Sequence, residues 1–115
     1  MVKDNYQTRA VYICSLYSGE VAKNVTAARR YCRFAVNKGY MPLAPHLLFP
    51  QFLNDTVPAE RGLGLSFGMA LMSLCAEVWV FGLAVSAGME AEIELAMRRD
   101  IRLRYFSENC EEVNA

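Results

Sequence analysis

Apolar residues along the chain follow two patterns, short uninterrupted runs and longer segments with a helical repeat. The short runs are rich in β-branched and aromatic residues and end in Ser, Gly or Pro, which is typical of buried strands that lead into loops. They predict strands at the start of residues 10–19, around 40–44, over 77–85 and over 101–106. Three prolines within nine residues require the second of these strands to give way to an irregular loop.

Two segments repeat apolar residues at the spacing of an amphipathic helix. One runs from Asn24 to Lys38, and we expect Asn24 to be its N-cap and Gly39 its stop signal. The other, residues 85–96, follows the third predicted strand. Strands that alternate with helices predict a parallel sheet with helices on both faces and right-handed crossovers. We therefore expect an α/β fold, a Rossmann-like or flavodoxin-like three-layer sandwich with a four- to five-stranded parallel sheet.

A further helix is predicted from Pro58 to Ala76, and its second part is unusually apolar. Pro58 and Glu60 are typical first-turn residues of a helix. Residues 62–76 then carry no charge at all. A helix that is apolar on all sides must be covered on all sides. Because the chain is short, we expect a second subunit to supply the cover, which predicts a homodimer or a higher homo-oligomer.

The size and the charge of the chain narrow the functional classes. With 115 residues, 54% of them apolar and 21% charged, we expect one domain over residues 10–107, an N-terminal extension (1–9) and a C-terminal tail (108–115). Twelve basic and twelve acidic residues give a net charge of zero, which argues against binding to nucleic acid. The first ten residues lack the pattern of a signal peptide, and no apolar run is long enough to span a membrane. We therefore expect a cytoplasmic protein without a membrane partner.

The four cysteines show no metal-binding pattern. They are far apart in the sequence, no two form a CxxC pair, and His46 is the only histidine of the chain. Reduced and mostly buried thiols are the expected state of Cys14, Cys32, Cys75 and Cys110. The sequence predicts no metal site and no cofactor.

Polar residues gather in the loops at the carboxyl ends of the predicted strands, where α/β sheets bind their ligands. These loops cover residues 15–19, 44–48 and 82–88. The Ser/Tyr/Gly cluster of the first loop suits an oxyanion or a phosphate, although an ordinary turn has the same composition. In the second loop, His46 is either a general acid or a loop residue that hydrogen-bonds the backbone.

Glutamates occupy alternate positions in the helix predicted over residues 85–96. At about 100° per residue, Glu90 and Glu94 fall within roughly 40° of each other and Glu92 points nearly the opposite way. The neighbours of Glu92 three and four positions away are apolar or glycine: Gly88, Met89, Leu95 and Ala96. We therefore expect Glu92 on the buried face of this helix.

The start of this helix offers a site for an anion close to Glu92. Backbone amides near Ser86 and Gly88, together with the Ser86 hydroxyl, can meet a negative group. The helix N-terminus favours the ionised form of Glu92 and burial opposes it, a conflict that is common for catalytic carboxylates. The alternatives are a salt bridge from Glu92 to Arg99 or Arg102, or a side chain that reaches into solvent.

Motifs between about residues 10 and 106 resemble the nucleoside 2-deoxyribosyltransferase-like superfamily. They are VYICSLYSG in the first strand and its loop, APHLLFP after the second strand, and S-x-G-x-x-x-E (Ser86, Gly88, Glu92) after the third. The superfamily includes nucleoside deoxyribosyltransferases, 2′-deoxynucleoside 5′-monophosphate N-glycosidases, and small uncharacterised proteins of phages and mobile elements. The chain resembles this last group most closely.

This resemblance implies an enzyme that cleaves the N-glycosidic bond of a small (deoxy)nucleotide. Glu92 would be the nucleophile that attacks C1′, with Tyr12 beside it as a second catalytic residue. The residues that the resemblance places around the nucleotide are Ser15, Tyr17, Ser18, Gly19, His46, Ser86, Gly88 and Met89. A serine at position 86 matches the glycosidase branch, which uses it for the 5′-phosphate, whereas the transferase branch has an aspartate.

The sequence departs from this family at the acids that help the base to leave. Gly68 stands where an aspartate is expected, and a further acidic position falls at Ala76 or Glu77. A general acid contributes about 10²- to 10⁴-fold to such a reaction. The candidates to replace it are His46, Asp55 and Glu60. The alternative function is a non-catalytic module that binds or sequesters a nucleotide, for example an ADP-ribose-like signal. A structural assembly protein without a ligand is the third possibility.

Overall fold

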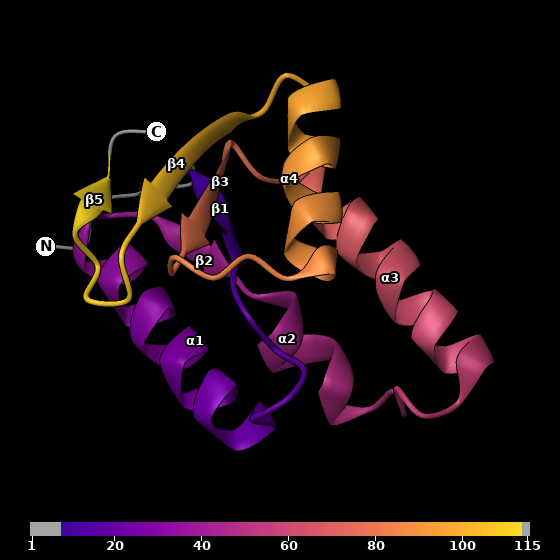
Figure 1. Ribbon diagram of the computed structural model, residues 1–115. Coiled ribbons are helices and arrows are strands. Elements are labelled where there is room, and N and C mark those ends of the chain that lie inside the picture. The colour runs from indigo at the N-terminus through magenta and orange to yellow at the C-terminus, as the bar shows by residue number, and fades with distance from the viewer. Residues whose placement is uncertain (1–7, 114–115) are drawn as a thin grey trace, which may run out of the picture.

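The computed structural model describes residues 8–113 and shows an α/β fold around a five-stranded, mostly parallel sheet (Figure 1). The strands are β1 (Ala10–Cys14), β2 (Met41–Leu43), β3 (Glu77–Phe81), β4 (Arg102–Phe106) and β5 (Glu112–Val113). The helices are α1 (Val21–Asn37), α2 (Pro45–Leu48), the short 3-10 helix η1 (Phe49–Gln51), α3 (Pro58–Met72) and α4 (Ala87–Arg98). The four strands that the sequence predicts are all present.

The strand order in the sheet is β2-β1-β3-β4-β5. The first four strands are parallel, as predicted, but β5 runs antiparallel to β4, so the sheet is not parallel throughout. β5 forms because the chain turns back after β4, where the Ser107 amide donates to the Glu111 carbonyl and Cys110 has a φ of 62°. It lies in the segment for which the sequence predicts a tail. Residues 1–7 of the predicted N-terminal extension and 114–115 of the tail lie outside the described residues.

Alternate residues of the central strands face opposite sides of the sheet and build two cores. One core faces α1 and contains the buried residues Val11, Ile13, Tyr31, Ala35, Trp79, Phe81 and Phe106. The other faces α4 and the end of α3, and its members include Tyr12, Cys14, Met72, Val78, Val80, Met89 and Ala96. Because β1 and β3 are buried along their whole length, they appear in the sequence as nearly continuous apolar runs.

The loop between β1 and α1 is held by Asn24, for which the sequence predicts the N-cap position. That prediction is wrong, because α1 begins at Val21 and Glu20 takes the cap position. The Asn24 side-chain amide instead donates hydrogen bonds to the carbonyls of Tyr17 (2.9 Å) and Ser18 (3.2 Å). Asn24 thus fixes the polar loop at the end of β1 from within the first turn of the helix.

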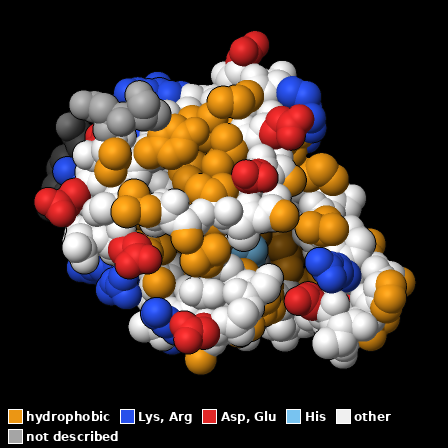
Figure 2. All heavy atoms as spheres, in the orientation of Figure 1, with side chains coloured by type: hydrophobic (Ala, Val, Ile, Leu, Met, Phe, Trp, Pro, Cys, Tyr) orange, Lys and Arg blue, Asp and Glu red, His pale blue; other side chains and the backbone are white. Residues whose placement is uncertain are grey.

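Much of α3 is exposed although most of it is uncharged. Only Gly68 and Met72 of its 15 residues are buried. The large apolar side chains exposed in and directly after it are Leu63, Leu65, Phe67, Met69 and Leu74. Figure 1 shows α3 reaching beyond α4 and away from the sheet, and Figure 2 shows apolar side chains along that edge of the molecule. Within residues 8–113, α3 and the other helices are too short or too polar to cross a membrane.

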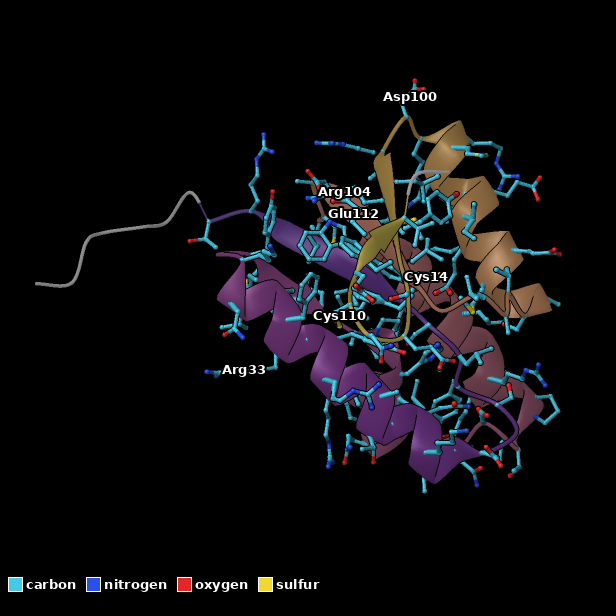
Figure 3. All side chains as sticks on the ribbon, turned by 60° about the vertical axis from the view of Figure 1, so that its left-hand side comes forward. Cys14, Arg33, Asp100, Arg104, Cys110 and Glu112 are labelled. Atoms are coloured by element: carbon cyan, nitrogen blue, oxygen red, sulfur yellow. The ribbon has the colours of Figure 1, made fainter. Side chains whose placement is uncertain are left out.

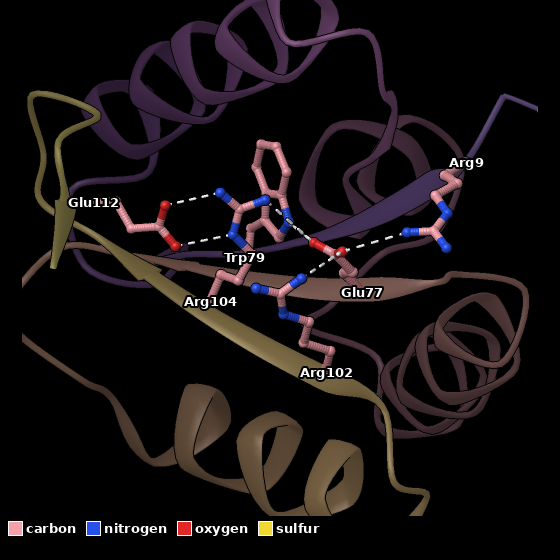
Figure 4. A network of polar contacts seen from close by, with 6 residues as sticks. All are labelled: Arg9, Glu77, Trp79, Arg102, Arg104 and Glu112. Atoms are coloured by element: carbon pink, nitrogen blue, oxygen red, sulfur yellow. Dashed lines mark hydrogen bonds and ion pairs between the residues drawn. The ribbon is translucent and has the colours of Figure 1, made fainter. Parts of the chain in front are cut away.

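Glu77 is buried among arginines at the edge of the sheet where the parallel strands begin (Figure 4). Its carboxylate accepts a hydrogen bond of 2.8 Å from Trp79 Nε1. The guanidinium groups near it are those of Arg9 (3.8 Å), Arg102 (3.6 Å) and Arg104 (3.5 Å). Arg104 also donates two hydrogen bonds, of 2.9 and 2.7 Å, to Glu112, which ties β5 to β4. The network therefore joins strands that are far apart in the sequence.

Candidate functional site

A cavity of about 630 Å³ lies at the carboxyl end of β1, bounded by the β1–α1 loop, α2, α3 and α4. Figure 2 shows the hollow in the surface, with the pale blue His46 recessed in it. Nearly all residues that the sequence predicts for the site line this cavity: Tyr12, Ser15, Tyr17, Ser18, His46, Ser86, Gly88, Met89 and Glu92. Gly19 is the exception, because with a φ of 92° it forms the turn that leads into α1.

Glu92 is brought to β1 by the topology of the sheet. β1 pairs with β3, and α4, which follows β3, packs back over both strands. The predicted orientation of the helix is confirmed, because Met89 and Ala96 are buried and Glu92 is half-buried between them. Oε2 of Glu92 accepts a hydrogen bond from the Tyr12 hydroxyl, and Oε1 accepts one of 3.5 Å from the Cys14 thiol. Both donors come from the same side of β1.

The arginines proposed as alternative partners of Glu92 are engaged elsewhere. Arg99 donates a hydrogen bond of 2.6 Å to the Met69 carbonyl in α3. Arg102 lies 3.6 Å from Glu77, at the start of β3. Within residues 8–113, Glu92 has a phenol and a thiol as hydrogen-bond donors and no ion pair.

Burial and mutual contact shift the pKa values of Glu92, Tyr12 and Cys14. Burial raises the pKa of Glu92 above its usual value, and the hydrogen bonds from Tyr12 and Cys14 offset part of that rise. The pKa values of Tyr12 and Cys14 are also raised, first by burial and then by the Glu92 carboxylate. Both groups therefore keep their protons at neutral pH and act as donors, while the carboxyl group is the one poised to change its charge.

The first turn of α4 forms part of the cavity wall next to Glu92. Ser86 is the N-cap, and its Oγ accepts a hydrogen bond of 3.2 Å from the Met89 amide. Ala87 and Gly88 follow it along the wall. Unpaired amides in a first helical turn and the positive end of the helix dipole both favour a bound anion.

Tyr17 and His46 form a stacked pair of rings in the wall, with centroids 4.8 Å apart and 25° between the ring planes. His46 lies in the short helix α2, and not in the irregular loop that the prolines predict. Burial lowers the pKa of His46 and a hydrogen bond to the Ser15 backbone offsets part of this, so that the imidazole is neutral at pH 7. The buried Ser15 hydroxyl has no hydrogen-bond partner among the described residues, so its hydrogen-bonding capacity is unsatisfied.

Gly68 lies directly beside the Tyr12 and Glu92 pair. A Cβ atom at Gly68 would lie 3.6 Å from the Tyr12 hydroxyl oxygen, so an acidic side chain at this position would reach the cavity. Asp55 and Glu60 do line the cavity, at its edge near the start of α3. Glu77 does not, because it lies at the opposite end of β3 in the arginine network.

The sequence analysis does not predict every residue of the site. Arg61 of α3 and Arg98 of α4 line the cavity and bring positive charge to it. Arg98 also pairs with Glu94 at 3.2 Å, which agrees with the solvent-facing position that the helical repeat gives both residues. Cys14 contacts Glu92 from the strand side, and its position two residues after Tyr12, on the same face of a strand, is the signal that would have found it.

Among residues 8–113, no group of three or more His, Cys, Asp or Glu side chains is arranged to hold a metal ion.

Comparison with known proteins places the chain in a family. No curated protein matches the chain. A family model described as a domain of unknown function (DUF7768) matches residues 9–106, a range that includes β1 to β4 and every residue that lines the cavity. The chain therefore belongs to the DUF7768 family.

Proposed function

We propose that the protein is a nucleotide N-glycosidase or a deoxyribosyltransferase-like enzyme, akin to the nucleoside 2-deoxyribosyltransferase-like superfamily, with Glu92 as its nucleophile. The observation that carries the proposal is the setting of this carboxylate, half-buried at a cavity of about 630 Å³ and bound by the Tyr12 hydroxyl. An oxocarbenium-like transition state requires such a carboxylate next to the anomeric carbon. Tyr12 would hold it in the orientation for attack.

The proposed reaction has two steps. In the first, a carboxylate oxygen of Glu92 forms a bond to C1′ of the sugar, and the C1′–N bond breaks with its electron pair going to the base, which takes up a proton. In the second step, water attacks C1′, the bond to Glu92 breaks and the carboxylate is restored. A proton of the water passes to a general base. In a transferase, a second nucleobase would take the place of water.

The ligand that the cavity suits is a small nucleotide. The first turn of α4, with Ser86, provides amides for a phosphate group. The stacked rings of Tyr17 and His46 provide a flat apolar surface for a base. Arg61 and Arg98 line the cavity together with Asp55, Glu60 and Glu92, so the lining as a whole has no positive excess, and the support for an anion comes from the first turn of α4.

A second candidate function is a module that binds a nucleotide without cleaving it. Gly68 favours it, because this position beside Tyr12 carries no acid to protonate the departing base. His46, Asp55 and Glu60 line the cavity and are the candidates for that role. His46, however, is neutral at pH 7 and would have to gain a proton when the ligand binds.

The proposal extends to the class of fold, a Rossmann-like or flavodoxin-like three-layer sandwich. The strand order β2-β1-β3-β4-β5 supports it, since flavodoxin-like sheets have this order and bind ligands where the order reverses. The separate buried clusters toward α1 and toward α4 also support it.

We also propose that the protein is a homodimer or a higher homo-oligomer that assembles through residues 62–76. Leu63, Phe67 and Leu74 are exposed by 46%, 41% and 72%, and they do not line the cavity. Leu63 and Phe67, four positions apart, lie on one side of α3 to within about 40°, and Leu74 follows directly after the helix. An identical apolar surface on a second copy would cover them by a two-fold contact.

The test of the function is incubation with a panel of deoxynucleoside monophosphates and related dinucleotides, followed by measurement of free base. Glu92→Gln is the test variant, and Glu94→Gln, on the solvent side of the same helix, is the matched control. Release of base by the wild type and by Glu94→Gln, but not by Glu92→Gln, supports the enzyme. Tight binding with an intact ligand supports the module, and absence of binding overturns both functions.

A further inference from the structure

Cys14 is a buried thiol that the reaction above does not use. It ends β1, its exposed fraction is 0%, and it does not line the cavity. Figure 3 shows Cys14 inside the fold, between the sheet and the helices, in contrast to Arg33, which points away from α1. The hydrogen-bond acceptor of the Cys14 thiol is Oε1 of Glu92, at 3.5 Å.

Tyr12 and Cys14 each donate a hydrogen bond to a different oxygen of the Glu92 carboxylate. The Tyr12 hydroxyl donates to Oε2 and the Cys14 thiol to Oε1. Two donors on two oxygens fix the rotation of the carboxylate about its last bond, which one donor would leave free. Tyr12 lines the cavity whereas Cys14 lies behind it, so Oε2 is held on the cavity side and Oε1 on the side of the sheet.

We propose that Cys14 is a positioning residue for Glu92, which holds Oε1 so that the other carboxylate oxygen faces the cavity. This role rests on the proposed function in so far as it concerns catalysis. The contact itself, however, can be tested whether or not the protein turns over a substrate.

A thiol suits this position better than a stronger donor does. An S–H group is a weak hydrogen-bond donor, so it orients the carboxylate while withdrawing little charge from it. A hydroxyl in its place would stabilise the ionised form more strongly and would make the carboxylate a poorer nucleophile. Burial and the Glu92 carboxylate both raise the pKa of Cys14, which keeps the thiol protonated as the donor.

The test compares Cys14→Ser, Cys14→Ala and Cys75→Ala in the full-length chain. Cys75 is the matched control, because it is also a buried thiol of the same core but donates to the Leu71 carbonyl at 3.5 Å. The main measurement is the pKa of the Glu92 carboxyl group by carbon-13 NMR. We expect it to be lowest in Cys14→Ser, intermediate in the wild type and highest in Cys14→Ala, and unchanged in Cys75→Ala.

An infrared measurement tests the contact without relying on the stability of the alanine variant. The S–H stretching band that Cys14→Ser removes is assigned to Cys14, and we expect it to shift when Glu92→Gln weakens its acceptor. The bands of the other thiols should stay in place. A Cys14 band that is the same in wild type and Glu92→Gln overturns the proposal.

The catalytic part of the role has its own measurement. If the wild type releases base, Cys14→Ala should lower kcat by roughly 10- to 100-fold with KM nearly unchanged, and Cys14→Ser should recover part of the loss. An equal loss in Cys75→Ala, or an unchanged pKa of Glu92 in Cys14→Ala, overturns the positioning role. If the wild type releases no base, the proposed enzyme fails, and the NMR and infrared results still decide whether Cys14 orients Glu92.

Discussion

The hydroxyl of Tyr12 in β1 donates a hydrogen bond to Oε2 of Glu92 in α4, although the two residues are 80 positions apart in the sequence. The contact exists because β1 and β3 are neighbours in the sheet and α4 follows β3. It joins β1 to α4 at the wall of the cavity. A change in either residue should therefore alter the titration of the other.

Tyr12→Phe should raise the pKa of Glu92 further, because the variant loses the hydrogen bond that stabilises the ionised carboxylate. In the proposed reaction Glu92 acts in its ionised form, so the acidic limb of the pH profile of base release should move to higher pH. The rate at neutral pH should fall by roughly 10²-fold. Tyr40→Phe, on the α1 side of the sheet next to Trp79, is the control and should leave the profile in place. A pH profile of Tyr12→Phe that coincides with the wild type contradicts this role.

Glu92→Gln should make the protein more stable at neutral pH. The pKa of Glu92 is raised in the folded state, so above that pKa the buried, ionised carboxylate lowers the free energy of unfolding. As the pH falls through the folded-state pKa toward the usual value of 4.5, the carboxyl group gains its proton and the cost disappears. We expect a gain of about 0.5–2 kcal/mol in the variant near pH 7.5, which shrinks toward pH 4.5.

Urea unfolding of wild type and Glu92→Gln at several pH values measures this difference. Glu94→Gln serves as the control, because Glu94 is exposed and its pair with Arg98 contributes only a few tenths of a kcal/mol. A gain for Glu92→Gln that is the same at all pH values would show that the buried charge is not its cause.

Sequence reasoning works for the parts of this molecule that depend on local pattern. The four parallel strands and the side of α4 that carries Glu92 follow from apolar runs and from the helical repeat. β5 and the role of Asn24 do not, since each depends on where a turn brings the chain, and two residues are too few to form a pattern. Cys14 shares a face of β1 with Tyr12 but was missed, because what its thiol contacts depends on how α4 packs on the sheet.

Glu77→Ala should destabilise the fold without changing ligand binding. The variant leaves the buried Trp79 Nε1 without its acceptor and removes the charge that faces Arg104, at a cost of about 2–4 kcal/mol. Glu77→Gln keeps an acceptor for Trp79 and should lose less. Chemical unfolding measures the stabilities, and ligand titration of the folded variants measures binding. A loss of binding in folded Glu77→Gln would contradict the view that this network only supports the sheet.

Glycines at two positions should respond to alanine in opposite directions. A Cβ at Gly62, in α3, meets nothing within 4 Å, so Gly62→Ala should stabilise the helix by about 0.5–1 kcal/mol. Gly39 ends α1 with a φ of 86°, as the sequence predicts, and Gly39→Ala should cost roughly 1–2 kcal/mol because an L side chain strains this conformation. Thermal unfolding at one protein concentration compares the stabilities of the two variants with that of the wild type. Similar melting temperatures for the two variants would mean that backbone conformation does not decide the outcome.

Leu63→Lys should weaken the proposed assembly through residues 62–76. A two-fold contact contains every substitution twice, so each interface gains two positive charges that lose water in apolar surroundings. Sedimentation velocity over a range of concentrations should show a larger species for the wild type and the monomer for Leu63→Lys. Leu83→Lys is the control, because Leu83 is 85% exposed in the loop before α4 and lies outside the proposed interface. If the wild type is a monomer at all concentrations, or if both variants dissociate alike, α3 is not the contact. Loss of nucleotide binding along with dissociation would show in addition that the second copy helps to close the cavity, because Leu63 itself does not line it.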